Sequence, residues 1–245
     1  MSTLLLRLAA PMQSWGVDSK FDRRGTGRIP SKSGVVGLCA AALGYRRGED
    51  EKILRLAHLN YGVRIDRPGN LLKDFHMAHE ELFWDPLDRS KINRGKKSSS
   101  YLTARYYLSD AAFLVGLEGE ENFLNEIEAA IRAPMFPLFL GRRSCPPEGR
   151  VSLGVAADSL RDALSLARQP LVARPHRTRS GTEVKPRLIL DADSSTQKHP
   201  HFLRDLPQSF NPEHRKYEFR CVCEFDVPEP ALPLKDHDYL AELEE

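Results

Sequence analysis

The chain carries the stretch GVVGLCAAAL at residues 34–43, which is apolar on nearly every side of a helix. Such a stretch predicts a helix buried in a core, and Gly44 directly after it is a typical helix end. Residues 3–9, TLLLRLA, form a second apolar run of the length expected for a buried strand. A polar loop at 12–30 separates the two, so the chain is expected to begin with a strand, a loop and a core helix.

The segments that follow continue this alternation of strands and helices. Their periodicity predicts one amphipathic helix at 120–132 and strands at 61–66, 71–79, 101–117 and 136–140. The order β-α-β-(β)-β-α-β predicts an α+β fold with a ferredoxin-like domain, a module also used in RNA recognition. Residues 1–155 are assigned to this domain. Residues 156–245 are assigned to a small C-terminal subdomain with an acidic tail and with strands at 187–190 and 217–227.

The charges of the 245 residues are segregated along the chain, although the net charge is only +2. Residues 1–47 carry eight Lys or Arg against two acids, and residues 86–107 carry six against one. Residues 228–245 carry six acids against one Lys. This distribution is typical of a polyanion-binding face and a separate acidic face.

Two further features indicate a soluble, cytoplasmic protein. No stretch approaches the ~20 apolar residues of a membrane-spanning helix, and the first strand lacks the flanks of a signal peptide. The four cysteines show no Cys-x-x-Cys spacing, which indicates a reduced compartment and no metal site.

The first candidate binding segment, residues 11–34, combines an aromatic plane, three arginines and the polar start of the core helix. An indole offers a stacking surface for a base, arginines bind phosphates, and free N–H groups at a helix start attract anions. The segment lacks the GxxxxGK[ST] pattern of a Walker phosphate loop. The alternative is a capped core helix under a solvated loop, with the indole as packing. The candidate RNA-binding residues here are Gln13, Ser14, Trp15, Arg23, Arg24, Arg28, Ser31, Lys32 and Ser33.

Two later segments add basic residues. A predicted strand ends at Gly141, which permits close approach of a ligand, and the paired side chains of Arg142 and Arg143 suit phosphates; the alternative is a tight turn with solvated arginines. Residues 85–100 form a basic, serine-rich loop that is expected to reach along a nucleic acid like a finger. Its candidate RNA-binding residues, with one on the following strand, are Lys91, Arg94, Lys96, Lys97 and Arg105.

Enzymatic alternatives have little support in the sequence. His76 lies near Asp74 on one predicted strand face, which suggests either a general base or, more commonly, a hydrogen bond or an RNA contact. No GxSxG, HExxH or clustered carboxylate pattern occurs. We therefore predict no catalytic residue, no metal ligand and no cofactor, and keep His76 as a candidate RNA-binding residue.

At these same residues the sequence resembles a known family. The chain is similar to the fifth Cas family of the RAMP superfamily, in the form found in type I-E CRISPR surveillance complexes, called Cascade. The resemblance covers roughly residues 3–155 and rests on LRLAAPMQSWG at 6–16, RRGTGRIPSKSGVVGL at 23–38, AAALG at 40–44, LKDFH at 72–76, YYLSDAAF at 106–113 and LGRRSCP at 140–146.

The resemblance implies a ferredoxin-like RAMP domain with a thumb at about 85–100. It implies a non-catalytic subunit that holds the five-prime handle of CRISPR RNA, for antiviral defence against invading DNA. The implied partners are this RNA, the backbone, large and RNA-processing subunits of Cascade, and target DNA indirectly through the guide. Type I-C relatives cut the precursor RNA, so a metal-independent endoribonuclease using His76 or a nearby tyrosine is the alternative.

Overall fold

The N-terminal strand and helix form the centre of the structure. The computed structural model describes residues 1–16, 22–79, 100–166, 186–192 and 201–227. Alternate leucines of β1 (Ser2–Ala9), beginning with Leu4, are fully buried on one face of the strand. Helix α1 (Lys32–Ala42) ends before Gly44, whose φ of +76° is a left-handed conformation that glycine favours at helix ends. The predicted strand and core helix are confirmed.

Seven strands form one antiparallel sheet in the order β10-β11-β9-β4-β7-β1-β8. Besides β1, its members are β4 (Asn60–Arg67), β7 (Ala112–Gly119), β8 (Ser152–Ala156), β9 (Arg187–Asp191), β10 (His201–Ser209) and β11 (Lys216–Asp226). The C-terminal strands therefore extend the same sheet, because β9 pairs with β4.

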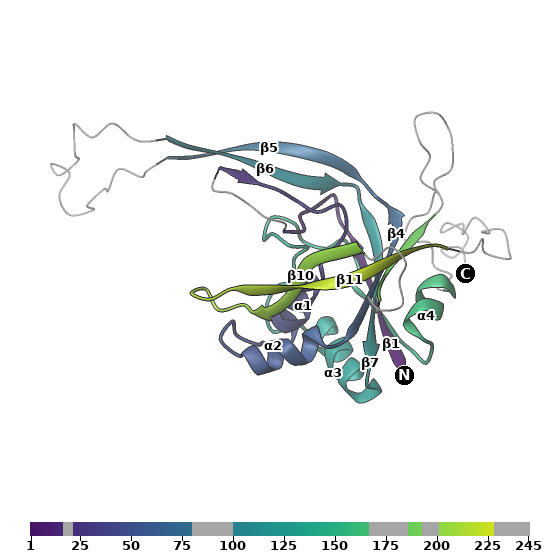
Figure 1. The fold of residues 1–245 in the computed structure, drawn as a ribbon. Helices are drawn as coiled ribbons and strands as arrows, with labels where there is room; N and C mark the ends of the chain where they lie inside the picture. Colours follow the sequence, from purple (N-terminus) through teal and green to yellow (C-terminus); the bar gives the residue numbers. More distant parts are fainter. Residues whose placement is uncertain (17–21, 80–99, 167–185, 193–200, 228–245) are drawn as a thin grey trace, which may run out of the picture.

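Helices cover both faces of this sheet (Figure 1). Helices α1, α2 (Asp50–Ala57) and α3 (Glu121–Arg132) bury the main core on one face. Helix α4 (Leu160–Leu166) packs on the other face, where its side chains meet those of β7 and β9. None of the helices in the described ranges is long and apolar enough to cross a bilayer.

A second sheet is built around a long two-stranded ribbon, β5 (Asn70–His79) and β6 (Ser100–Ser109), which runs along the top of the molecule in Figure 1. The short strands β2 (Met12–Gln13) and β3 (Arg23–Arg24) also pair with β6. We call β5 and β6 the β5–β6 ribbon. The thumb predicted at 85–100 lies outside the described residues, except for the first residue of β6.

The predicted α+β class is confirmed, as are the strands expected at 61–66, 71–79, 101–117, 187–190 and 217–227 and the helix expected at 120–132. The strand predicted at 136–140 is wrong. The N–H groups of Met135 and Phe136 donate instead to the last carbonyl groups of α1, at 3.0 and 3.2 Å. Pro137 has no N–H for a strand ladder, so this segment ties down the end of α1, and β8 takes the place beside β1. The elements α2, α4, β8 and β10 were not predicted, and neither were the short strands β2 and β3, which lie inside the loop expected at 12–30.

Candidate nucleic-acid interface

The first predicted binding segment begins inside the core. Gln13, Ser14 and Trp15 are at most 2% exposed. The Trp15 indole N–H donates to the Gln13 side-chain oxygen at 3.1 Å, and the Gln13 amide donates to the carbonyl groups of Leu8 and Ala111 at 3.1 and 2.8 Å. The stacking surface predicted on Trp15 is therefore wrong, because the indole joins core elements and offers no ring face to a base.

The N–H groups at the start of α1 also find their acceptors within the protein. The Ser31 hydroxyl accepts from the Gly34 N–H at 3.3 Å, and the Lys32 N–H donates to the Asp205 carboxylate of β10 at 2.8 Å. The Lys32 ammonium lies 2.8 Å from Asp191 at the end of β9. The helix dipole and its free donors thus face a carboxylate of the same chain. The phosphate site predicted at this helix start is wrong for this reason, and the half-buried Ser33 hydroxyl lies against Ser31.

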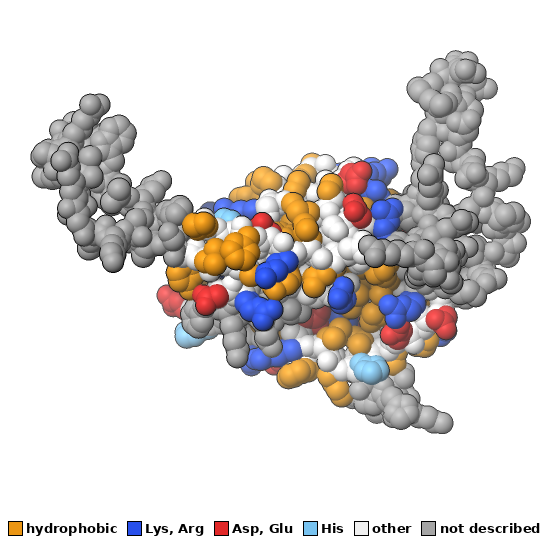
Figure 2. Space-filling model, turned by 90° about the horizontal axis from the view of Figure 1, so that it is seen from above, with side chains coloured by type: hydrophobic (Ala, Val, Ile, Leu, Met, Phe, Trp, Pro, Cys, Tyr) orange, Lys and Arg blue, Asp and Glu red, His pale blue; other side chains and the backbone are white. Residues whose placement is uncertain are grey.

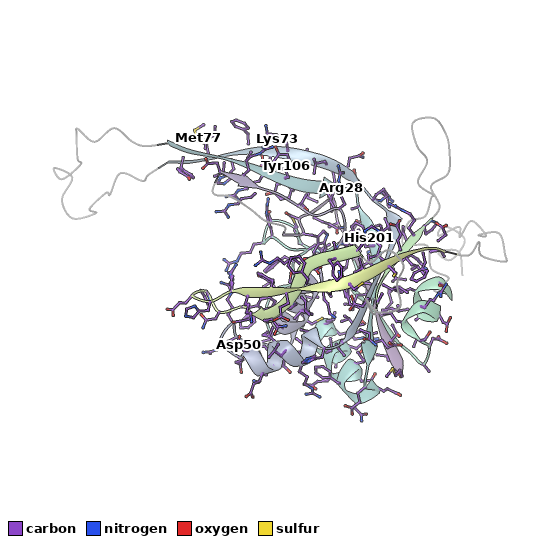
Figure 3. All side chains as sticks on the ribbon, in the orientation of Figure 1. Arg28, Asp50, Lys73, Met77, Tyr106 and His201 are labelled. Carbon is purple, nitrogen blue, oxygen red and sulfur yellow. The ribbon has the colours of Figure 1, made fainter. Side chains whose placement is uncertain are left out.

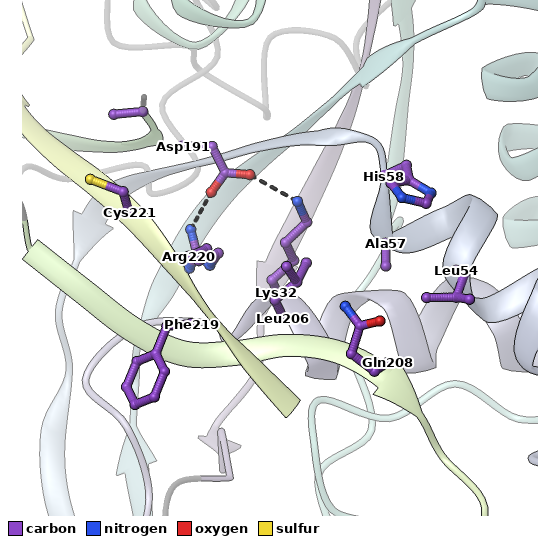
Figure 4. A pocket seen from close by; sticks show the side chains of 11 residues that line it. Lys32, Leu54, Ala57, His58, Asp191, Leu206, Gln208, Phe219, Arg220 and Cys221 are labelled. Atoms are coloured by element: carbon purple, nitrogen blue, oxygen red, sulfur yellow. Dashed lines mark hydrogen bonds and ion pairs between the residues drawn. The ribbon is translucent and has the colours of Figure 1, made fainter. Parts of the chain in front are cut away.

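Arg220 of β11 completes this buried group. Its guanidinium hydrogen-bonds Asp205 at 2.6 and 3.0 Å. It also hydrogen-bonds Asp191 at 2.5 Å (Figure 4). Its hydrogen bonds to Asp205 and the nearby carboxylates raise the pKa of Arg220 against the opposing effect of burial. We call Lys32, Asp191, Asp205 and Arg220 the ionic cluster, and it joins the C-terminal strands to α1.

Three other arginines lie at the pairing of β3 with β6. Arg24 and Arg105 are register partners, so their side chains leave the same face of the second sheet. The Arg142 guanidinium lies 4.8 Å from the ring centre of Tyr107 on that face, and it donates to the Arg24 carbonyl at 2.8 Å. No carboxylate of a described residue forms an ion pair with any of the three. We call Arg24, Arg105 and Arg142 the arginine triad.

Two donors of the arginine triad are buried, and no described residue accepts a hydrogen bond from them. The Arg105 Nε and the Arg142 Nη1 have no hydrogen-bond partner among the described residues. A buried N–H without a partner costs about 1–3 kcal/mol, more for a charged group. An anion that reaches these guanidinium groups would supply acceptors and the missing negative charge.

The opposite face of the β5–β6 ribbon mixes aromatic, apolar and cationic side chains. Lys73 lies opposite Tyr106, and Met77 lies further along the ribbon (Figure 3). Strand alternation puts Phe75 and Met77 on the same face as Lys73, and they are 65% and 54% exposed. Arg23 donates to the Tyr106 hydroxyl at 3.0 Å, which lowers the pKa of that hydroxyl. Seen from above, hydrophobic side chains and Lys or Arg side chains lie side by side (Figure 2). Such a surface can stack bases and attract phosphates together.

Known proteins share this arrangement of chain segments. Residues 3–223 match the family described as CRISPR-associated protein (Cas_Cas5). The chain belongs to the Cas5 family. It is 36% identical over 171 residues to "CRISPR system Cascade subunit CasD" of Escherichia coli (strain K12), which covers 64% of this chain and 73% of that protein. The resemblance stated from the sequence, to the form of this family found in Cascade, is confirmed.

Two solved structures are similar over nearly the whole Cas5 chain. One is a crystal structure of a Cas protein, with 35% identity, a TM-score of 0.67, and coverage of 96% of this chain and 100% of that one. The other is a chain of a CRISPR RNA-guided surveillance complex, with 34% identity, a TM-score of 0.70, and coverage of 94% and 91%.

The remaining predicted residues of the Cas5 chain belong to none of the groups defined above. Arg28 and Arg143 are exposed. His76 is half-buried on β5, where its carbonyl accepts from the Thr103 hydroxyl at 3.2 Å, and no described side chain hydrogen-bonds its imidazole. Four predicted residues lie outside the described residues: Lys91, Arg94, Lys96 and Lys97.

Sequence reasoning missed the aromatic and apolar members of the ribbon surface, Phe75, Met77 and Tyr106. The signal was present, because bulky and cationic residues alternate with period two along residues 73–77. It also missed Asp205, which lies 173 residues from Lys32 and carries no local pattern.

Proposed function

We propose that this Cas5 chain is a non-catalytic RNA-binding subunit of a type I-E Cascade complex. In this proposal it holds the five-prime handle of the CRISPR RNA beside the β5–β6 ribbon and serves antiviral defence against invading DNA. Its partners are the backbone, large and RNA-processing subunits, and it meets target DNA only through the guide. The family membership and the likeness to a Cascade subunit and to a surveillance-complex chain support the proposal.

The observation that carries the proposal is the pair of unsatisfied guanidinium donors in the arginine triad. Phosphate oxygens of a backbone that passes the triad would accept from Arg105 Nε and Arg142 Nη1, the two donors that no described residue satisfies. Charge-assisted hydrogen bonds of this kind contribute about 1.5–3 kcal/mol each. The ribbon surface around Phe75 and Tyr106 would hold unstacked bases of the same strand.

The proposed architecture follows from the same elements. Strands β4-β7-β1-β8 with α1 and α3 have the strand order of a ferredoxin-like domain, and we assign residues 1–155 to it and 156–245 to a C-terminal subdomain. We also propose that the segment between β5 and β6 is the thumb. Its basic residues Lys91, Arg94, Lys96 and Lys97 would extend the phosphate contacts of the triad.

RNA binding by Arg105 variants tests the proposal. Arg105→Gln removes a charge and the Nε donor, and it should weaken binding of handle RNA by about 10-fold or more at physiological salt. The slope of log affinity against log salt should also fall by about 0.7–0.9 for the lost phosphate contact. Binding is measured by fluorescence anisotropy with a labelled repeat RNA, for the purified chain and for the assembled complex.

Arg161→Gln is the control, because it removes the same charge from an arginine of α4 that is exposed, lies 4.6 Å from an aromatic ring and sits on the other side of the large sheet. Equal losses for the two variants would remove the arginine triad from the binding site. Incubation of the chain with precursor RNA in EDTA tests the absence of catalysis, and clean cleavage would contradict it.

A further inference from the structure

The hairpin formed by β10 and β11 displays two phenylalanines and an arginine to solvent. Phe202 is 54% and Phe219 is 63% exposed, and the Arg204 guanidinium lies 5.9 Å from the Phe219 ring centre. Phe202 is the register partner of Cys221, so alternation puts Phe202 and Phe219 on one face. The register shifts between Leu203 and Leu206, and the contact with the Phe219 ring places Arg204 beside that face. We call these three residues the hairpin patch.

The backbone under the hairpin patch is held rigidly from its other face. Asp205 and Arg220, the neighbours of Arg204 and Phe219 in sequence, are buried members of the ionic cluster. Their mutual hydrogen bonds at 2.6 and 3.0 Å join the two strands directly behind the patch. Such preorganisation reduces the entropy that is lost when surface side chains bind a partner.

A pocket of about 340 Å³ adjoins the patch (Figure 4). Phe219 forms one wall, and Leu54 and Ala57 of α2 and Leu206 of β10 add apolar surface. Gln208 and three members of the ionic cluster, Lys32, Asp191 and Arg220, supply polar groups in the same pocket. An exposed aromatic ring next to a pocket, with an arginine beside it, has the composition of an interface hot spot.

The charge of the hairpin favours a protein partner over a nucleic acid. Its exposed ionisable side chains, histidines aside, are three cations and four acids, which gives a net charge of −1: Arg204, Arg215 and Lys216 against Glu213, Glu218, Glu224 and Asp226. A nucleic-acid backbone requires a positive surface to replace its counterions. Arg204 has no ion pair with a described residue, so a carboxylate of the partner would complement it.

We propose that the hairpin patch docks a neighbouring protein subunit of the ribonucleoprotein. The subunit would present an apolar surface with a side chain that enters the pocket and a carboxylate opposite Arg204. This proposal rests on the proposed function, since that function supplies the assembly. It assigns a surface distinct from the arginine triad, which takes the RNA.

The first experiment compares assembly and RNA binding in one variant. Phe202→Ser with Phe219→Ser is co-expressed with the other subunits and the guide RNA of its own system. We expect at least 10-fold weaker retention of one protein subunit, and an affinity of the isolated chain for labelled handle RNA within 2-fold of the original. Phe136→Ser is the control, because Phe136 is similarly exposed, at 47%, and lies outside the patch.

Unchanged assembly, or a loss no greater than that of Phe136→Ser, would overturn the proposal, as would a drop in RNA affinity instead. Failure of the unaltered chain to bind RNA, with subunit loss still seen, would reject the proposed function and leave the docking surface standing. A photoreactive benzoyl-phenylalanine at position 219 gives a second test in an intact fold. Crosslinks to another protein subunit are expected, whereas crosslinks to RNA, to a second copy of this chain, or to nothing would each contradict the inference.

Discussion

Replacement of Asp205 by alanine should destabilise the fold more than any single surface change. The carboxylate accepts from the Lys32 N–H and from two nitrogens of Arg220, and the variant leaves all three donors without it. Removal of one partner from a buried ion pair costs about 3–5 kcal/mol. Because Arg220 keeps its contact with Asp191 at 2.5 Å, we expect the lower part of this range, about 3 kcal/mol.

The measurement is urea denaturation of the purified chain followed by circular dichroism, with thermal melting beside it. A loss of about 3 kcal/mol corresponds to about 6–12 °C in the melting temperature for a chain of this size. Glu224→Ala is the matched control, since Glu224 pairs with Arg187 at 2.6 Å but both side chains are about half exposed. That control should change stability by no more than about 1 kcal/mol. If the two variants lose equal stability, the ionic cluster does not hold the C-terminal strands as argued.

Three further outcomes follow from the described contacts. Gly141→Ala should lower stability by at least about 2 kcal/mol, because φ is +86° and the added Cβ would lie 1.6 Å from the Ser14 carbonyl oxygen. The control is Gly149→Ala, where φ is +65° but the added Cβ would lie 3.3 Å from the flexible side chain of Arg7. This control should cost about 1 kcal/mol in the same denaturation assay. Burial raises the pKa of the Cys39 thiol from 9.0 to about 12, so the unfolded chain loses this proton at a lower pH than the folded chain does. Stability should therefore fall by about 1.4 kcal/mol per pH unit between pH 9.0 and about 12, and Cys39→Ala should reduce this slope. His76→Ala should leave guide length and precursor processing unchanged on a sequencing gel, because no described side chain hydrogen-bonds its imidazole; loss of processing would restore the nuclease alternative.

Local patterns were sufficient for the elements that are regular and apolar. The run at 34–43 forms α1 because it is apolar on nearly every side, as a buried helix requires. The hydrophobic residues at 120–132 form α3 because their spacing matches the helical period. Helix α2 was missed because its eight residues are too few for a clear period, and β8 because two of its five residues are serine and glycine.

The candidate site was harder to predict because it depends on contacts between distant segments. The polar and aromatic residues near the N-terminus are compatible either with an RNA-binding surface or with hydrogen bonds inside the core. Their contacts with Ala111 and Asp205 show that they bond inside the core. Arg24, Arg105 and Arg142 were each predicted as RNA contacts, but their meeting required the pairing of β3 with β6 and the turn at Gly141. Charge and residue type therefore indicated the chemistry, whereas tertiary packing determines which groups remain available for it.

The packing of Trp15 on Gly34 has a consequence for how such sequences can diverge. A methyl group at position 34 would lie 2.9 Å from the indole ring, which is closer than carbon atoms in proteins approach. A larger residue at 34 therefore needs a smaller ring at 15, so the two positions can change only together. A family of such chains would retain both residues in the absence of any ligand contact, as a pair fixed by shape alone.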